Sequence, residues 1–391
     1  MSAVACRSKS LGGLPAGVDW WLLLDVLALA GLGVVMVGSA SLHLGAAHGR
    51  PFAYLDKHLV ALALGAAGAL AVLQIPVRWI ERASPALYFL GIALLVLVLI
   101  PGVGKTVNGA TRWIAVGGFN LQTSEFMKLF LIFYMAGYLM RRKVEVAHTL
   151  WGVVKPVMLV VLAAMLLMAQ PDFGTTAVLL ATVMGMLFLG GAPLWQFGVL
   201  FLLVSIGGAL LVITSPYRLA RVTSFLDPWS DPLGSGYQLT QALIAFGRGE
   251  WAGVGLGNGI QKQFYLPEAH TDFIMAVIGE EFGLVGTVAV ILLFAVLVWR
   301  AFSIGAVAEA AGRGYAAHVA WGIGLWLGMQ AFVNIGVNVG LLPTKGLTLP
   351  FISYGSNSLI VSCLAVGVLL RIHWENCTGD DSPGGLPWRA S

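Results

Sequence analysis

One segment of the chain, LPEAHTDFIMAVIGEEFG at residues 266–283, places carboxylates at the start of an apolar run and inside it. Asp272 stands at the start, and Glu280 and Glu281 lie within. Ionisable side chains in an apolar segment are costly to bury and are therefore candidates for a functional site. Asp272 could act as a general base that removes a proton from an attacking hydroxyl. Thr271 or Asp272 could instead cap the helix, and the residues alone favour that cap.

Helix geometry separates these three carboxylates. In a helix that starts at Asp272, Glu280 and Glu281 would lie about 12–13.5 Å deeper, with Glu281 on the opposite side. The paired carboxyl groups of glycosidases stand about 5–9.5 Å apart across one bond. We therefore predict a single base at Asp272, and we interpret the two glutamates as buried residues that are neutral, partnered or lining a cavity.

Further charged residues suggest how an anionic ligand could be held. Glu125 and Lys128 are three residues apart at the start of another apolar run, so they share one helix face. They form either an ion pair that lets both enter a membrane or a charged cavity lining. Basic residues in the polar segments could bind a phosphate-bearing lipid, or could merely reach the membrane interface. These basic residues are Arg112, Arg218, Arg221, Arg248, Lys262 and Lys345.

Two glycine-containing segments imitate nucleotide-binding motifs without their defining features. Gly104-Lys105-Thr106 resembles the end of a P-loop, but Leu99 stands where that pattern requires its first glycine. The segment from Gly247 to Ala252 follows no strand pattern, so it does not predict a dinucleotide site. The histidines and cysteines lack metal-ligand spacing. We therefore expect no nucleotide site and no built-in metal site.

The elements that position these residues are predicted to be membrane helices. The chain has 391 residues, of which 58% are hydrophobic and 10% charged, and its mean hydropathy is +0.87. Soluble proteins carry about 25% charged residues. A membrane span needs roughly 20 apolar residues. The sequence predicts an all-α integral membrane protein with about ten spans, at residues 20–41, 58–75, 84–100, 124–140, 156–170, 174–190, 195–213, 272–299, 316–340 and 352–371.

The distribution of Lys and Arg predicts the orientation. With ten spans both termini share one side, which carries twelve basic residues against five in the short loops opposite. Basic residues concentrate on the cytoplasmic side. We therefore expect cytoplasmic tails at residues 1–18 and 374–391, a membrane domain at 19–373, and a large extracytoplasmic loop at 214–271 between the seventh and eighth spans. The net charge of +4 reflects this bias and does not indicate a nucleic-acid partner.

Six segments together resemble the SEDS family of peptidoglycan glycosyltransferases. The segment PTKGLTLP resembles the cell-division branch, because the elongation branch carries a more apolar stretch in place of residues 344–346. Thr123 replaces a proline of the family pattern, and Ser356 replaces a glycine, but neither departure touches a charged candidate. The segments are NGATRWI (108–114), SEFMKL (124–129), QPDFGT (170–175), FLDPWSDPLGSGYQ (225–238), LPEAHTDFIMAVIGEEFG (266–283) and PTKGLTLPFISYG (343–355).

The resemblance implies an inner-membrane enzyme that polymerises lipid II at the outer face during septal wall synthesis. Asp272 matches the essential aspartate of the family and would be the general base. The implied partners are lipid II, a class B penicillin-binding transpeptidase and regulatory membrane proteins of the division machinery. The implied substrate-binding residues are Arg112, Trp113, Glu125, Lys128, Arg218, Arg221, Gln238, Lys345, Ser353 and Tyr354.

This chemistry requires one base and several positive charges. Pyrophosphate leaves as an anion, so it needs no protonating acid but does need electrostatic stabilisation. Mg²⁺ or Mn²⁺ could share that role, although the sequence shows no dedicated ligand set. Two alternatives stay open, namely a lipid II flippase or other transporter and a non-catalytic division scaffold. A transporter site should lie near the bilayer midplane, whereas the polar residues here gather toward the predicted outer half.

Overall fold

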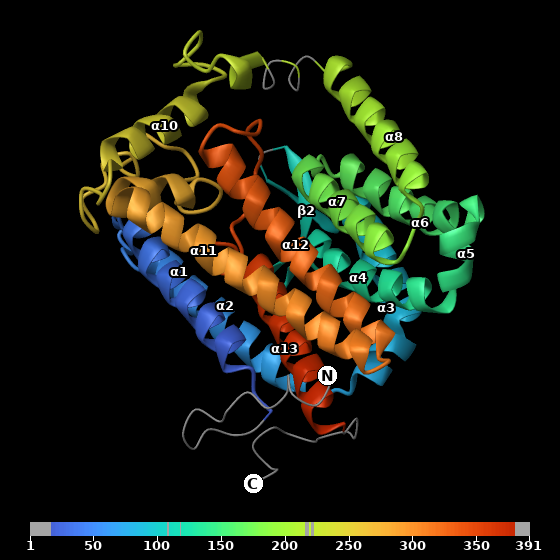
Figure 1. Cartoon of the computed structure of the whole chain (residues 1–391). Coiled ribbons are helices and arrows are strands. Elements are labelled where there is room, and N and C mark those ends of the chain that lie inside the picture. Colours follow the sequence, from blue (N-terminus) through green and yellow to red (C-terminus); the bar gives the residue numbers. More distant parts are fainter. Residues whose placement is uncertain (1–16, 108, 118, 216–218, 220–222, 380–391) are drawn as a thin grey trace.

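A bundle of long helices dominates the structure (Figure 1). The computed structural model describes residues 17–379, apart from 108, 118, 216–218 and 220–222. Among the described residues, seven helices are long and apolar enough to cross a membrane, and α7 and α8 are shorter apolar helices. The predicted helical membrane fold is confirmed. The helices that match the predicted spans are α1 (Trp20–Ala47), α2 (Ala53–Leu73), α3 (Val77–Leu99), α4 (Thr123–Arg141), α6 (Leu150–Ala169), α7 (Phe173–Leu189), α8 (Leu194–Ile213), α11 (Ile274–Ala310), α12 (Gly314–Asn338) and α13 (Ser356–Thr378).

Glycines allow α2 and α13 to pack closely. A Cβ added at Gly65 would lie 3.0 Å from the Cys363 side chain, and one at Gly367 would lie 2.7 Å from the Ala69 carbonyl. Small residues serve this purpose in membrane helices because association there depends on close packing. The start of α1 and the end of α13 meet at one end of the bundle, where Gly17 lies against Trp374.

The opposite end carries a small antiparallel sheet that the sequence did not predict. Its strands, in spatial order, are β1 (Gly104–Val107), β2 (Ala110–Val116) and β3 (Phe119–Gln122). Trp113 of β2 is paired with Lys105 of β1 and with Gln122 of β3. The sheet therefore fixes β2 just before α4 begins, and we refer to this part of the molecule as the sheet end.

The predicted 214–271 loop contains α10 (Tyr237–Gly249), and the segment after it docks against a break in α11. Gly283 interrupts α11 with φ 65° and ψ −158°, a conformation that suits glycine. Residues 254–255 donate their N–H groups to the carbonyls of residues 280–281, at 3.0 and 3.1 Å. Residues 284–285 in turn donate to the carbonyls of residues 250–251, at 2.9 and 3.1 Å. The first turns of α11 are thus held by the segment that precedes them. A short helix, α5 (Lys143–His148), connects α4 to α6.

Candidate active site

A cavity of about 1440 Å³ opens at the sheet end and is lined by β2 and β3, by α2, α4 and α7, and by the loop at residues 339–355. The structure brings seven of the predicted site residues to its wall: Arg112, Trp113, Glu125, Gln238, Asp272, Lys345 and Tyr354. Arg218 and Arg221 lie outside the described residues. No group of three or more His, Cys, Asp or Glu side chains that could hold a metal ion occurs in the described part of the chain.

The backbone at Asp272 is held by donors from two other elements. The three consecutive carbonyls of residues 270–272 all accept hydrogen bonds from the C-terminal part of the chain. The Tyr354 N–H donates to the first at 2.9 Å, and Ser353 Oγ donates to the second at 2.6 Å. Asn334 Nδ2 and Asn338 Nδ2, from α12, donate to the third at 2.9 Å each. Ser353, which was predicted to bind substrate, is instead buried behind the cavity wall, where it holds the Asp272 segment.

The helix that follows Asp272 starts later than the sequence predicted. α11 begins at Ile274, and its N-cap residue, Phe273, makes no side-chain cap hydrogen bond. Thr271 Oγ1 donates to the Glu268 carbonyl at 3.1 Å. Neither Thr271 nor Asp272 therefore occupies the N-cap position, which was the role that the residues alone favoured.

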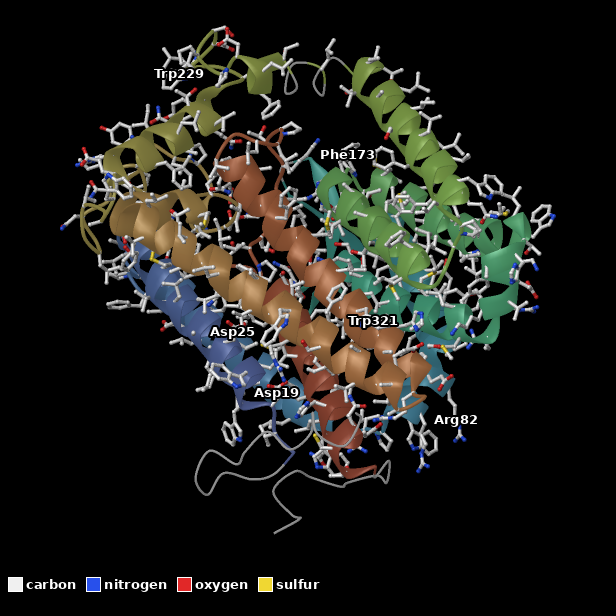
Figure 2. All side chains as sticks on the ribbon, viewed as in Figure 1. Asp19, Asp25, Arg82, Phe173, Trp229 and Trp321 are labelled. Atoms are coloured by element: carbon white, nitrogen blue, oxygen red, sulfur yellow. The ribbon has the colours of Figure 1, made fainter. Side chains whose placement is uncertain are left out.

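Two cations of the cavity wall have defined neighbours. Arg112 of β2 donates through Nε to the Gln170 carbonyl at 3.2 Å, and its Nη1 lies 3.9 Å from Asp172 Oδ1. These contacts join the sheet to the turn between α6 and α7. Lys345 Nζ lies 4.0 Å from the centre of the Phe173 ring, which stands at the start of α7 (Figure 2). Both cations thus reach the cavity from elements other than the one that carries Asp272.

Glu125 and Lys128 form the predicted ion pair, and one of the two, Glu125, also lines the cavity. Lys128 Nζ contacts Glu125 Oε1 at 2.9 Å and Gln330 Oε1 at 2.7 Å, and it lies 5.1 Å from the centre of the Trp326 ring. Glu125 lines the cavity, whereas Lys128 is buried behind it and is not among its lining residues. The structure therefore places Lys128 as the partner of a cavity carboxylate and not at the cavity wall.

The two deeper glutamates are partnered structural residues. Glu280 is fully buried and accepts from the Ile260 N–H at 2.9 Å and from Arg248 Nη1 at 3.2 Å. Glu281 pairs with Lys262 Nζ at 2.5 Å. Neither glutamate belongs to the cavity wall. The partnered interpretation is therefore correct, the cavity-lining one is wrong, and Arg248 and Lys262 are engaged by these carboxylates.

The side chain two residues before Asp272 belongs to an aromatic cluster. The His270 ring lies 5.1 Å from the Tyr54 ring and 5.5 Å from the Tyr354 ring, between centroids. Burial lowers the pKa of His270, and the nearby Glu268 carboxylate opposes that shift. His270 is therefore a neutral packing group at pH 7.

Three amide side chains of α12 were overlooked in the sequence. Gln330, Asn334 and Asn338 are spaced four residues apart, so they form one polar stripe along the helix. Gln330 Nε2 donates to the Thr348 carbonyl at 2.9 Å, and the two asparagines contact the Asp272 carbonyl. The regular spacing of amides in an apolar span was the available signal, because buried amides must find hydrogen-bond partners.

Comparisons with known proteins place the chain among bacterial cell-wall proteins. Residues 20–377 match the FtsW/RodA/SpoVE model, described as a cell cycle protein family. A relative from Allochromatium vinosum, named probable peptidoglycan glycosyltransferase FtsW, is 59% identical over 91% of this chain and 89% of its own.

Solved structures show the same fold. A chain of a peptidoglycan synthase complex, described as coordinating polymerization and crosslinking, is 31% identical with a TM-score of 0.76, covering 92% of this chain and 99% of that one. The Thermus thermophilus rod shape determining protein RodA is 30% identical with a TM-score of 0.68, covering 92% and 97%.

Proposed function

Since the chain belongs to the FtsW/RodA/SpoVE family, which is the SEDS family, we infer that it is a peptidoglycan glycosyltransferase. The single observation that carries the proposed site is Asp272 itself, a carboxylate in the wall of a large cavity with its backbone held by two other elements. We propose that this cavity binds lipid II and that Asp272 is the general base of polymerisation.

In the proposed reaction the Asp272 carboxylate takes the proton of the acceptor sugar hydroxyl as its oxygen attacks the anomeric carbon of the donor. The new glycosidic C–O bond forms while the bond to the lipid pyrophosphate breaks, with inversion at that carbon. The departing pyrophosphate keeps its negative charge, which Arg112 and Lys345 stabilise from the cavity wall. Arg218, Arg221, Trp113, Gln238 and Tyr354 remain substrate-binding candidates. A Mg²⁺ or Mn²⁺ ion would be bound chiefly by the pyrophosphate.

The proposed location follows from the charge bias and the position of the cavity. The excess of basic residues assigns the end where α1 starts and α13 ends to the cytoplasm. The cavity at the sheet end then faces outward, where lipid II is polymerised. We propose that the protein acts in the cytoplasmic membrane at the division septum. The solved synthase complex supports a crosslinking transpeptidase as its partner, and division regulators are further proposed partners.

The test is incubation of the purified full-length protein and its cognate transpeptidase with lipid II in detergent. The expected product is a glycan polymer, seen on a denaturing gel. A parallel assay in vesicles measures transbilayer movement of lipid II. Movement of lipid II without polymer would favour a flippase over a glycosyltransferase. The absence of both polymer and movement would favour a non-catalytic scaffold.

Lys345→Ala should raise the KM for lipid II by about 10- to 100-fold, because one charge-assisted contact to a phosphate is worth about 1.5–3 kcal/mol. Lys345 also stacks on the Phe173 ring, and arginine can make the same contact. Lys345→Arg should therefore retain most of the affinity for lipid II. The measurement is the initial polymerisation rate against lipid II concentration. An unchanged KM for Lys345→Ala would remove this residue from the substrate site.

Gly346→Ala should lower the polymerisation rate about tenfold with little loss of stability. A Cβ at Gly346 would lie 2.9 Å from Asp272 Oδ2, so the carboxylate must move. Displacement of a catalytic group by 1 Å can cost about 10²-fold. The matched control is Gly247→Ala in α10, where an added Cβ meets nothing within 4 Å. Equal rates for the two variants would show that this contact does not position the base.

A further inference from the structure

The Asn338 side chain joins the Asp272 backbone to the first turn of α11. Asn338 is fully buried at the end of α12. Its Oδ1 accepts from the Ala276 N–H at 3.1 Å, and its Nδ2 donates to the Asp272 carbonyl at 2.9 Å. The first N–H groups of a helix have no partner within the helix. The Ala276 N–H also donates to the Phe273 carbonyl at 3.1 Å, but Phe273 makes no side-chain cap, so Asn338 supplies from a neighbouring helix the side-chain acceptor that an N-cap residue normally supplies.

Asn334 extends this link to the loop that carries Lys345. Its side chain is also buried, and its Nδ2 donates to the Asp272 carbonyl at 2.9 Å and to the Leu347 carbonyl at 2.5 Å. Leu347 follows Gly346, where an added Cβ would lie 2.9 Å from Asp272 Oδ2. One amide therefore fixes the spacing between the turn that holds the carboxylate and the loop that holds the cation.

The amide of Asn338 both accepts and donates, as its two contacts require. A carboxylate accepts but does not donate, and an aliphatic side chain does neither. Loss of the amide would leave the buried Asp272 carbonyl with one donor fewer and the Ala276 N–H without its Asn338 acceptor. The turn would then lose a restraint that sets where its carboxylate points. This loss matters because catalytic groups must be held to within about 0.5 Å of their productive position.

We propose that Asn338, together with Asn334, is a positioning residue that sets the place and direction of the Asp272 carboxylate through its backbone. This role rests on the proposed function, in which Asp272 is the general base. The asparagines touch the turn and not the substrate, so their effect should fall on turnover and leave substrate binding largely intact.

The test uses full-length Asn338→Leu and Asn338→Asp proteins in the polymerisation assay. Asn338→Leu should lower kcat by about 10²-fold, with the KM for lipid II changed less than about twofold. Asn338→Asp keeps the acceptor for the Ala276 N–H but brings a second carboxylate toward Asp272. A like charge raises the pKa of a base, so the acidic limb of the rate profile should move to higher pH by about one unit.

The control is Asn376→Ala at the other end of the bundle. Asn376 Nδ2 donates to the Ile304 carbonyl at 3.1 Å, and its Oδ1 accepts from Arg313 Nη1 at 2.8 Å, so a comparable set of bonds is lost. This variant should lower thermal stability without changing kcat or the pH profile. Asn338 variants that lose activity only in proportion to their folded fraction would overturn the positioning role, as would their failure to fold beside a folded Asn376→Ala protein.

Asp272→Asn, measured in parallel, separates this proposal from the proposed function. An inactive Asp272→Asn protein beside an Asn338→Leu protein with normal kcat would overturn the positioning role alone. Polymer formed at the normal rate by Asp272→Asn would overturn the general base and the positioning role together.

Discussion

Asp272→Asn should lower the rate of glycan polymerisation by about 10²–10⁴-fold, the range that general-base catalysis contributes. The asparagine amide has nearly the shape of the carboxylate but cannot accept the hydroxyl proton. The backbone contacts from Ser353, Asn334 and Asn338 do not involve the side chain, so they are retained. We therefore expect normal yield, normal thermal unfolding and nearly normal lipid II binding from a protein whose polymerisation rate is lowered by that factor.

Glu281→Gln is the matched comparison, because it removes a carboxylate from the same helix. Glu281 is buried against Lys262 and lies outside the cavity wall. Its loss should reduce stability, and activity should fall only as far as the folded fraction falls. Equal loss of polymerisation in well-folded Glu281→Gln and Asp272→Asn proteins would contradict the assignment of a single base.

Lys128→Met should be the most destabilising substitution in the cavity region, at about 3–5 kcal/mol. Lys128 and Glu125 are 3% and 4% exposed, and removal of one partner leaves the other charge buried and uncompensated. Gln330 Oε1 would also lose its contact with Lys128 Nζ, which spans 2.7 Å. The measurement is the free energy of unfolding in detergent, or the shift in thermal midpoint where unfolding is irreversible.

The double variant Glu125→Gln/Lys128→Met should recover much of that stability, because replacement of both charges removes the desolvation cost along with the attraction. A double-mutant cycle isolates the coupling between the two side chains. Additive effects of the two single substitutions would show that the pair is not coupled. Since Glu125 lines the cavity, recovery of stability without recovery of activity would assign its carboxylate a direct role in substrate binding.

The sequence predicted the helices well because each membrane span requires a continuous run of apolar residues, which is visible locally. It also predicted Asp272 as the base, through motifs that extend over several elements, and the structure places that residue in the cavity wall. The sheet at residues 104–122 was not predicted, since its strands are short and follow a membrane span directly. The late start of α11 was missed for a different reason, namely that the side-chain acceptor for its first turn lies on α12, far away in sequence.

The placement of individual polar side chains depended on contacts that no local pattern contains. Lys128 and Ser353 were assigned to the substrate, but both support the cavity from behind. Glu280 is satisfied largely by backbone N–H groups of residues 260–261. Almost every residue carries a backbone N–H, so the sequence does not indicate which of them will donate to a given carboxylate. Only the folded structure shows this. The stripe of Gln330, Asn334 and Asn338, by contrast, was overlooked although its regular spacing is visible in the sequence.

The break at Gly283 divides α11 into two parts that we expect to unfold locally at different rates. Residues 274–282 precede the break, and the carbonyls of residues 280–281 accept hydrogen bonds from the segment after α10. Cooperative opening follows hydrogen bonds and packing, and it need not follow the covalent order of the chain. Under amide hydrogen exchange these residues should therefore become labelled together with residues 249–262, ahead of the rest of α11. The boundary between slow- and fast-exchanging amides would then fall inside a single helix, at its one left-handed glycine.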